Sequence, residues 1–261
     1  MSRKTDLALA LAAFAHEGQT DKAGVDYVEH PKAVAATFTD EKRIIVALLH
    51  DVLEDTFVSE ETIRNLFGGE IAEACRALTH ADGEPYLDYV QRAIQNPIAR
   101  DVKKADLLNN MDLKRLPNIT AWDTKRIREK YIPALELIIE AEKKSAVHEF
   151  ALKWLEKFGD EAIDERELLG DDMFDDCKRL GFEMDCGQAF GEEYDLAAGD
   201  YQALRRVIDK VTDIQLLGSA IFSQWRYFNH WADPGEDICD SENRGWFILA
   251  LGRLAELACE G

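Results

Sequence analysis

The stretch "VALLHDVLEDT", which spans Val46–Thr56, places His50 and Asp51 side by side within an apolar run. Glu54 and Asp55 follow at spacings that put them on the same helix face as Asp51. Burying ionisable groups costs solvation free energy, and neighbouring carboxylates repel one another. A divalent cation bound between these side chains would remove both costs. The stretch therefore predicts a helix that carries a metal site.

Two other segments supply further side chains of the kind that bind metal ions. "YVEHP" places His30 just before a predicted helix, and "VKKADLLNN" places Asp106 inside a helix with apolar periodicity. With His50 and Asp51 they form a mixed set of imidazoles and carboxylates. Such a set suits Mn²⁺, Fe²⁺ or Zn²⁺ with open coordination positions better than a closed structural zinc site. We therefore expect these side chains to converge on one cation.

Apolar residues recur with the period of an α-helix along most of the chain, and strand alternation is scarce. Glycines and prolines mark the breaks between the helical segments. We predict helices at about residues 6–17, 31–38, 41–53, 59–66, 70–79, 85–95, 98–111, 120–144, 196–210, 214–232 and 241–258. The predicted fold class is all-α.

The helical segments fall into two groups that differ in charge. We predict an N-terminal helical domain over residues 1–146 and an acidic helical accessory domain of unknown role over residues 147–261. Within the second domain, the acidic run "GDEAIDERELLGDDMFDD" is expected to be a loop or a weak helix. In "LLGSAIFSQWRYFNHW", apolar residues recur at spacings of three and four, which predicts a core helix. These residues are Leu217, Ile221, Trp225, Phe228 and Trp231.

The composition is that of an ordinary soluble protein, with 46% hydrophobic and 31% charged residues and a net charge of −20. Residues 1–147 hold 20 basic and 25 acidic side chains, which leaves 11 and 26 for residues 148–261. Such a surface repels phosphate backbones and anionic lipids, so neither nucleic acid nor a membrane is the expected partner. A small anionic substrate remains compatible, because a local basic cluster can overcome a distant net charge.

The cysteines and the N-terminus both favour a cytoplasmic protein. The five cysteines are an odd number and include no CxxC pair, which favours free thiols in a reducing compartment. The apolar run Leu7–Ala15 follows Asp6, a suitable N-cap, so we interpret it as a helix rather than a cleaved signal peptide. No apolar run approaches the ~20 residues that a membrane span needs.

The pattern H…HD…D resembles that of the HD-domain metal-dependent phosphohydrolases. Within them, the chain is similar to the alarmone-hydrolase branch, that is, the hydrolase domain of RelA/SpoT-type proteins and their small free-standing relatives. The resemblance covers about the first 140 residues, and no counterpart of the family's synthetase domain is present. The matching motifs follow in the family's order: "FAHEGQTDKAG" (14–24), "YVEHPKAVA" (27–35), "VALLHDVLEDT" (46–56), "FGGEIAEACRALT" (67–79) and "VKKADLLNNMDL" (102–113).

The resemblance implies a role for each matching residue. It makes His30, His50, Asp51 and Asp106 the ligands of a metal ion, usually manganese in that family. Glu54 and Asp55 match the acidic pair that positions and deprotonates the attacking water. Asn110 matches a residue that contacts the substrate sugar, and Lys22 matches a lysine that lines the nucleotide pocket. The implied reaction is hydrolysis of guanosine 3′,5′-bis(diphosphate), (p)ppGpp, at its 3′-pyrophosphate.

Three departures from the alarmone-hydrolase pattern replace a residue that is commonly basic. Asp21 stands where an arginine usually lies beside the guanine, and Leu107 and Asp112 replace positions that are commonly basic. An anion in place of a cation near a polyanionic substrate weakens binding. The departures favour an alternative in which the same chemistry acts on another nucleotide, such as NADPH or an adenosine-based alarmone. A second alternative is a non-catalytic nucleotide sensor, against which the intact acidic pair argues.

Some basic residues and histidines have two interpretations. The run "KRIREK", Lys125–Lys130, is expected to be a solvated helix face, with phosphate binding across the pocket as the alternative. Lys103 and Lys104 fit solvent exposure and a functional role equally well. His16 is expected to pack in the core or in a pocket wall rather than to bind a metal ion.

Overall fold

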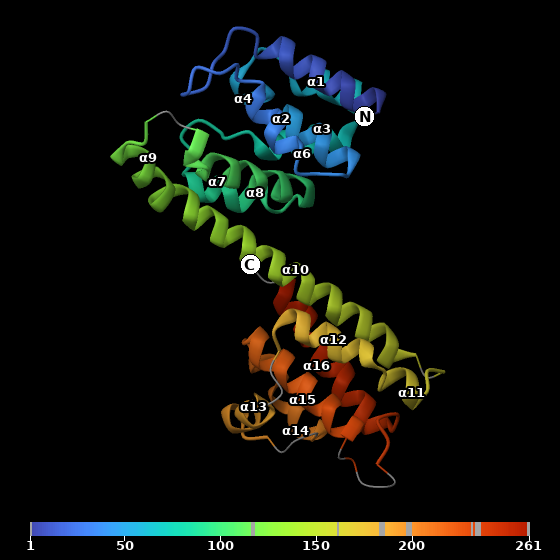
Figure 1. Cartoon of the computed structure of the whole chain (residues 1–261). Coiled ribbons are helices and arrows are strands. Elements are labelled where there is room, and N and C mark those ends of the chain that lie inside the picture. Colours follow the sequence, from blue (N-terminus) through green and yellow to red (C-terminus); the bar gives the residue numbers. More distant parts are fainter. Residues whose placement is uncertain are drawn as a thin grey trace. The chain divides into compact units, whose positions relative to one another are not determined.

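The computed structural model describes residues 2–115, 118–160, 162–182, 186–196, 200–230, 232 and 236–259. These residues are mostly helical, and their only β-pairing is an isolated bridge between Thr20 and Asp26. The predicted all-α class is confirmed. The chain forms two compact units, Met1–Ala141 and Glu142–Gly261 (Figure 1). Among the described residues, no helix has the length and apolar character needed to cross a membrane.

The first unit is a bundle of short helices. They are α1 (Arg3–Ala15), α2 (Glu29–Ala35), α3 (Glu41–Leu49), α4 (Val52–Asp55), α5 (Glu60–Phe67), α6 (Gly69–Leu78), α7 (Tyr86–Ala93), α8 (Pro97–Met111), the 3₁₀ turn η1 (Leu113–Arg115), α9 (Ala121–Arg126), the π-helical turn η2 (Ile127–Tyr131) and the start of α10 (Ile132–Gly159).

Side-chain caps fix where several of these helices begin. Ser2, Asp40, Ser59 and Asn96 each accept a hydrogen bond from a backbone N–H in the first turn of α1, α3, α5 and α8, respectively. These N–H groups have no partner within the helix, so each cap satisfies a donor that would otherwise be left unpaired. The predicted starts of α3, α5 and α8 therefore lie within one residue of the observed ones, whereas α1 begins at Arg3 after Ser2, so the prediction of Asp6 as its N-cap is wrong.

Helix α3 lies at the centre of the first unit. It packs against α1, α2, α6 and α8, and its last five residues, Ile45–Leu49, are all buried. Burial on every side explains why this segment is a continuous apolar run rather than an amphipathic one. The end of α3 therefore delivers His50 into the interior of the unit.

The predicted helix 41–53 is wrong in one respect, because it breaks at His50 and Asp51. His50 is the C-cap of α3 and Asp51 is the N-cap of the short helix α4. The imidazole Nδ1 of His50 donates to the carbonyl oxygen of Ala47, 2.7 Å away, one turn back along α3. Both cap residues keep right-handed φ and ψ, so apolar periodicity continues through the break and hides it in the sequence.

The predicted helix 120–144 is also divided. It begins as α9, opens into the π-helical turn η2 and continues as α10 as far as Gly159. Thr120 and Asp123 form a reciprocal capping box at its start. The unit boundary at Ala141 therefore falls within α10 and not at the predicted end of a helix near residue 146.

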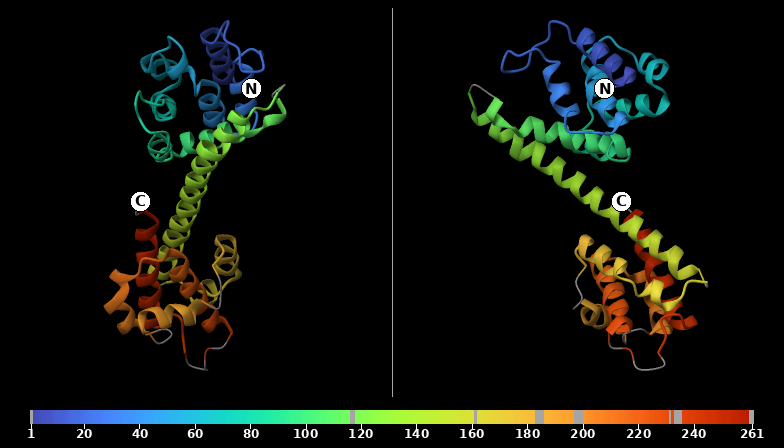
Figure 2. Two further views of the ribbon diagram at one scale, coloured as in Figure 1. Left: turned by 90° about the vertical axis from the view of Figure 1, so that its left-hand side faces the viewer. Right: turned by 45° about the vertical axis from the view of Figure 1, so that its right-hand side comes forward.

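All regular secondary structure among the described residues of the second unit is helical (Figure 2). The acidic run expected to be a loop or weak helix forms α11 and α12, because its apolar members Leu168 and Met173 are fully buried. The predicted helix 196–210 is shorter than expected and ends in a 3₁₀ turn. The helices are α11 (Glu165–Leu168), α12 (Asp171–Leu180), α13 (Cys186–Tyr194), α14 (Tyr201–Val207), the turn η3 (Ile208–Lys210), α15 (Ile214–His230) and α16 (Ser241–Cys259).

Helix α15 forms much of the core of the second unit, as its apolar spacing predicts. Leu217, Ile221, Trp225 and Phe228 are buried, whereas Trp231 lies outside the described residues. The indole Nε1 of Trp225 donates to the carbonyl oxygen of Leu168, 2.9 Å away, which ties α15 to α11.

Candidate active site

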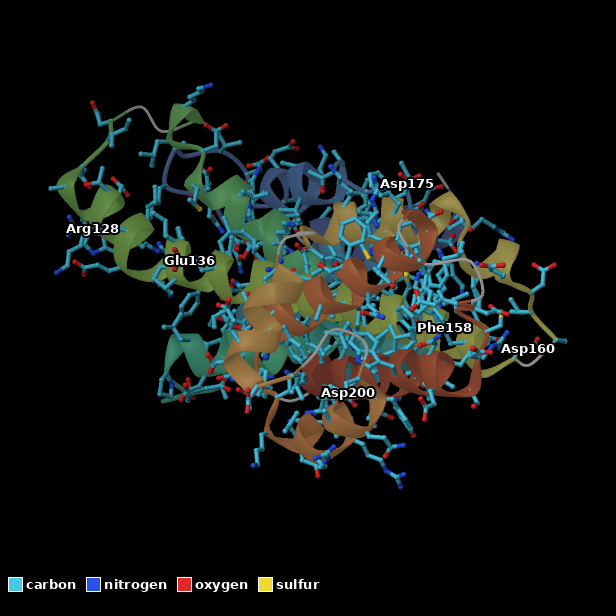
Figure 3. All side chains as sticks on the ribbon, turned by 90° about the horizontal axis from the view of Figure 1, so that it is seen from below. Arg128, Glu136, Phe158, Asp160, Asp175 and Asp200 are labelled. Carbon is cyan, nitrogen blue, oxygen red and sulfur yellow. The ribbon has the colours of Figure 1, made fainter. Side chains whose placement is uncertain are left out.

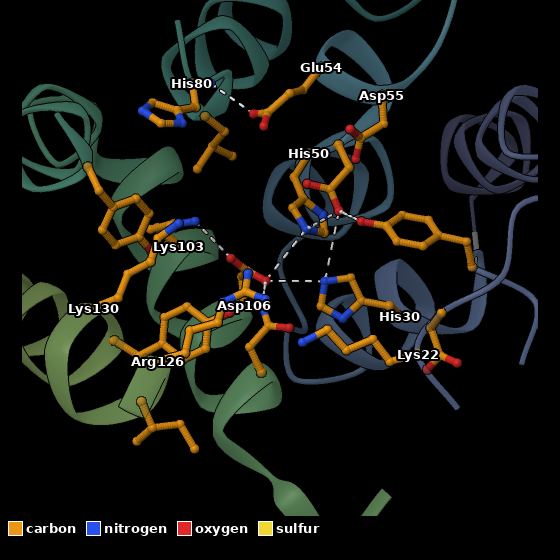
Figure 4. A pocket seen from close by; sticks show the side chains of 18 of the residues that line it. Lys22, His30, His50, Glu54, Asp55, His80, Lys103, Asp106, Arg126 and Lys130 are labelled. Atoms are coloured by element: carbon orange, nitrogen blue, oxygen red, sulfur yellow. Dashed lines mark hydrogen bonds and ion pairs between the residues drawn. The ribbon is translucent and has the colours of Figure 1, made fainter. Parts of the chain in front are cut away.

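A cavity of about 390 Å³ opens in the first unit. Side chains from the loop before α2, from the junction of α3 with α4, from α7 and α8 and from the π-helical turn η2 line it (Figure 4). All eight residues that the sequence proposes for the site are among its lining residues: Lys22, His30, His50, Asp51, Glu54, Asp55, Asp106 and Asn110.

The imidazole of His50 is held in one tautomer. Its Nδ1 faces a carbonyl oxygen, that of Ala47, and must therefore carry the proton. Its Nε2 then presents a lone pair toward Asp51 Oδ2 at 3.0 Å and Asp106 Oδ1 at 3.8 Å. Nε2 is buried and has no hydrogen-bond partner among the described residues.

His30 is arranged in the same way from the other side of the cavity. Its Nδ1 lies 2.9 Å from Asn109 Oδ1, an acceptor, so the proton resides on Nδ1. Its Nε2 lies 3.1 Å from Asp106 Oδ1 and 3.9 Å from Asp51 Oδ2. The two imidazole lone pairs therefore face the same two carboxylate oxygens.

This donor set fits a divalent cation. One ligand atom from each of His30, His50 and Asp106 lies within 4.8 Å of the others, and all three side chains are buried. Asp51 adds a carboxylate oxygen next to both imidazoles. An imidazole lone pair repels a carboxylate oxygen when no proton lies between them. A cation bound between the lone pairs and the carboxylates would attract both.

Charged and polar neighbours orient the two carboxylates. Lys103 Nζ donates to Asp106 Oδ2 at 2.9 Å, and Asn110 Nδ2 donates to Asp106 Oδ1 at 2.5 Å. The hydroxyl of Tyr27 donates to Asp51 Oδ2 at 2.6 Å. Burial raises the pKa of Asp106, but the charge of the Lys103 ammonium is the largest of the effects that oppose burial, and the pKa lies well below its usual range. Asp106 is therefore ionised and ready to bind a cation.

Glu54 and Asp55 lie on α4 at the mouth of the cavity, next to the four proposed ligands. Glu54 Oε2 accepts a hydrogen bond from the backbone N–H of His80, 2.9 Å away, which fixes the carboxylate (Figure 4). Burial raises the pKa of Asp55, and the charges of Asp51 and Glu54 raise it further. Two carboxylates thus flank the proposed metal site without contributing to the buried donor set.

Lys22 stands at the rim of the cavity. Its Nζ lies 3.5 Å from Asp123 Oδ1 and 4.0 Å from the centre of the Trp122 ring. Asn110 lies deeper, one turn beyond Asp106 on α8. The structure therefore brings both residues to the cavity but gives each a protein partner.

The three departures from the alarmone-hydrolase pattern differ in position. Asp21 and Asp112 line the cavity, so two carboxylates do lie where cations were expected. Asp21 Oδ1 accepts from the backbone N–H groups of Ala23 and Val25, and so closes the loop that it occupies. Leu107 is fully buried in the core, away from the cavity, and its replacement of a basic residue has no direct effect on a ligand.

Sequence reasoning missed two features of the site. The first is Asn109, whose oxygen fixes the tautomer of His30 and whose only signal in the sequence is its place three residues beyond Asp106. The second is the basic side of the cavity. Lys103 is buried rather than solvated, and Arg126 and Lys130 of the run "KRIREK" line the cavity together with tyrosines from α7 and η2.

Comparison with known proteins agrees with this geometry. An HD-domain family model matches residues 8–111. The bifunctional (p)ppGpp synthase/hydrolase SpoT of Escherichia coli is 29% identical over 171 residues, which is 60% of this chain and 24% of that protein. The guanosine-3′,5′-bis(diphosphate) 3′-pyrophosphohydrolase MESH1 of Mus musculus is 30% identical over 158 residues, which is 55% of this chain and 88% of that protein.

A solved structure of a metazoan SpoT ortholog, described as hydrolysing ppGpp, is 28% identical, with a TM-score of 0.45 over 53% of this chain and 86% of that one. The chain spans only 17% and 24% of the first curated relatives that it matches. It covers most of MESH1, however, and the HD-domain match includes every proposed metal ligand. The chain therefore belongs to the HD-domain family.

Proposed function

We propose that this protein is a metal-dependent phosphohydrolase that removes the 3′-pyrophosphate of guanosine 3′,5′-bis(diphosphate). The observation that carries the proposal is the paired orientation of His30 and His50, whose Nε2 lone pairs face Asp51 and Asp106 beside two further carboxylates. The relatives named as pyrophosphohydrolases support the choice of substrate.

His30, His50, Asp51 and Asp106 are proposed to hold the metal ion, with Mn²⁺ as the preferred species. A mixed set of imidazoles and carboxylates with room for further ligands suits this ion. A divalent cation there acidifies water and polarises phosphoryl oxygens. Lys103 keeps Asp106 ionised, and Tyr27 holds Asp51 in place, so the donor set is organised before the ion binds.

Glu54 and Asp55 are proposed to orient the attacking water and to accept its proton on a carboxylate oxygen. The hydrogen bond from His80 fixes Glu54 Oε2, and Oε1 is proposed to face the water. The water oxygen bonds to phosphorus as the bond from phosphorus to the ribose 3′ oxygen breaks. The 3′ oxygen leaves with the bonding electron pair and takes up a proton, which gives a free 3′-hydroxyl and pyrophosphate.

Lys22 and Asn110 are proposed to position the nucleotide. Lys22 lies at the rim over Trp122, where a cation can meet the base or an exposed phosphate. Asn110 lies beside Asp106, where an amide can bond a ribose hydroxyl close to the reacting phosphorus. The reaction is proposed for the cytoplasm, since Cys75, Cys177, Cys239 and Cys259 are free thiols.

A second candidate is the same reaction on another nucleotide, such as NADPH or an adenosine-based alarmone. Asp21 and Asp112 line the cavity, and their charges disfavour a substrate that places phosphates next to them. Asp21 and Asp112 affect the choice of substrate and not the proposed metal site, because neither residue is hydrogen-bonded to a proposed metal ligand among the described residues.

The test is turnover of a nucleotide panel by the purified protein with Mn²⁺. Release of pyrophosphate from guanosine 3′,5′-bis(diphosphate), faster than any release from NADPH or adenosine nucleotides, is the expected result. Faster turnover of another nucleotide would support the second candidate. If the protein binds Mn²⁺ and nucleotide yet hydrolyses none of them, the non-catalytic sensor replaces both.

A further inference from the structure

The basic run "KRIREK" divides into two pairs of residues with different surroundings. Arg126 and Lys130 are half-buried and line the cavity, whereas Lys125 and Arg128 are exposed. Figure 3 shows Arg128 pointing away from the body of the protein. Arg126 and Lys130 are four positions apart and share one side of the helix, whereas Arg128, two positions from each, lies on the opposite side.

The exposed pair is already neutralised by the chain. Lys125 Nζ lies 3.7 Å from Glu129 Oε2, and Arg128 donates to Glu129 Oε1 at 3.0 Å. The cavity pair differs in this respect. Within the part of the chain that the structure describes, neither Arg126 nor Lys130 forms an ion pair or a hydrogen bond with an acidic side chain.

Aromatic rings hold the two cavity cations in place. The Arg126 guanidinium lies 5.2 Å from the centre of the Trp122 ring and 5.0 Å from that of Tyr131. Lys130 Nζ lies 3.9 Å above the ring of Tyr86. Rings stabilise a cation weakly compared with a carboxylate and leave its N–H donors free to bond an anion.

The two cations also repel each other. Burial lowers the pKa of Lys130, and the charges of Arg126 and Lys103 lower it further. Lys103 is compensated by its contact with Asp106, whereas at Lys130 the charges of Glu54 and Asp106 only partly offset burial and the neighbouring cations. A bound anion would remove the repulsion and satisfy both groups.

The position of the pair relative to the proposed metal ligands indicates which anion this is. Figure 4 shows Arg126 and Lys130 on one side of the cavity and His30 and His50 on the other, with Asp106 between them. The two cations and the two imidazoles therefore lie on opposite sides of Asp106. An anion that bonds both cations is expected to be a different group of the bound molecule from the phosphate at the metal site.

We propose that Arg126 and Lys130 form a second phosphate subsite, which selects nucleotides with a phosphate or pyrophosphate group remote from the one hydrolysed. The proposal rests on the proposed function and deepens it, because it names the feature of the substrate that the cavity selects. Each cation is expected to contribute about tenfold to affinity, as charge-assisted hydrogen bonds to phosphate do.

The test compares two ligands that differ only in the remote group. In a Glu54→Ala background, which prevents turnover, calorimetry measures binding of guanosine 3′,5′-bis(diphosphate) and of guanosine 3′-diphosphate, both with Mn²⁺. We expect Arg126→Gln/Lys130→Gln to weaken binding of the first ligand about 100-fold and to leave binding of the second within about twofold. The second ligand also shows that the variant is folded and keeps its metal site.

Lys125→Gln/Arg128→Gln is the matched control, since it removes the same charge from the same segment outside the cavity. An equal loss for both ligands, an equal loss in the control, or no loss at all would overturn the subsite.

Turnover separates this proposal from the proposed function. If the wild-type protein hydrolyses no nucleotide but the selective loss of binding appears, the hydrolase assignment fails and the subsite stands. If the protein hydrolyses both ligands and the cavity variant changes KM equally for them, the subsite fails alone. We expect a KM raised about 100-fold for the bis(diphosphate) only, with kcat little changed.

Discussion

The Nε2 atom of His30 lies 3.1 Å from Oδ1 of Asp106, although the two residues come from different helices, α2 and α8, and are far apart in sequence. His50 approaches the same oxygen from the end of α3, at 3.8 Å. Three elements of the first unit therefore converge on one point, and their convergence requires the whole bundle to be folded. The proposed metal site and the fold of this unit are thus interdependent.

Removing a proposed ligand should abolish metal binding, whereas removing a proposed water-handling acid should not. We expect His50→Ala to reduce Mn²⁺ content below detection after gel filtration, because half of the imidazole pair is lost. Glu54→Ala should keep the metal and lose at least about 100-fold in kcat. Metal analysis and single-turnover kinetics check both. His148→Ala, a histidine of the second unit, is the control. A metal-free Glu54→Ala protein would place that residue among the ligands instead.

Lys103 should matter more to the stability of the metal-free protein than to that of the Mn²⁺-loaded protein. Lys103→Met leaves the buried carboxylate of Asp106 without its cation, which costs about 3–5 kcal/mol. Bound Mn²⁺ supplies a replacement positive charge, so the loss measured by urea unfolding should shrink when the ion is added. Lys125→Met, on the exposed face, should change little under either condition. An equal loss with and without Mn²⁺ would mean that Lys103 and the ion do not share Asp106.

The ion pair between Glu84 and Arg92 should make stability depend on pH in the acid range. The Arg92 guanidinium donates to Glu84 Oε1 at 2.9 Å and to Oε2 at 2.8 Å, and it lowers the pKa of Glu84 from 4.5 to about 2. Because the folded-state pKa is the lower one, the contribution is fully present above the unfolded-state pKa and is lost as the pH falls from about 4.5 to about 2.

The wild-type protein should therefore exceed Glu84→Gln in stability above pH 5 by a constant amount, and the two should converge toward pH 2. Urea unfolding across this range measures the difference, in which the titration of all other carboxylates cancels. A difference that persists unchanged at low pH would show that the Glu84 charge is not its source. Glu84 also borders the loop whose His80 N–H holds Glu54, so this pair supports the cavity mouth.

Two glycines of the second unit should respond to alanine in opposite directions. A Cβ at Gly218 would lie 2.2 Å from the ring of Phe182, so Gly218→Ala forces a shift in a close-packed core and should cost about 1–3 kcal/mol. A Cβ at Gly252, in α16, meets nothing within 4 Å, so Gly252→Ala should stabilise the protein by about 0.5–1 kcal/mol. Thermal unfolding compares them. Equal effects would contradict the packing of α15 on Phe182.

The sequence predicted most helices and the donor set because both depend on residue type and spacing. Apolar periodicity, capping residues such as Ser59 and the order of the motifs are properties of the sequence itself and can be recognised without a structure. The break at His50 and Asp51 was not predictable, because both residues keep helical dihedral angles. The basic side of the cavity was missed for a related reason. Helical spacing places Lys130 on the side of Arg126 and Arg128 on the other side, but only the packing of the folded unit decides which side faces the cavity.

Asn109 should control metal affinity without binding the ion. Its Oδ1 accepts from His30 Nδ1, and it thereby directs the unprotonated Nε2 toward Asp51 and Asp106. Without this acceptor, the ring can rotate or change tautomer, and neighbours of this kind are worth about 10–100-fold in metal affinity. We therefore expect Asn109→Ala to weaken Mn²⁺ binding by that factor.

Asn109→Asp keeps an acceptor at the same position and should retain most of the affinity. Isothermal titration calorimetry with Mn²⁺ measures the metal affinity of both variants. Asn96→Ala serves as a control, since it removes an amide that caps the distant start of the same helix, α8. Unchanged affinity in Asn109→Ala would show that His30 is oriented by its packing alone. A loss in Asn109→Asp as large as that in Asn109→Ala would show that the amide group, rather than an acceptor oxygen, is what His30 requires.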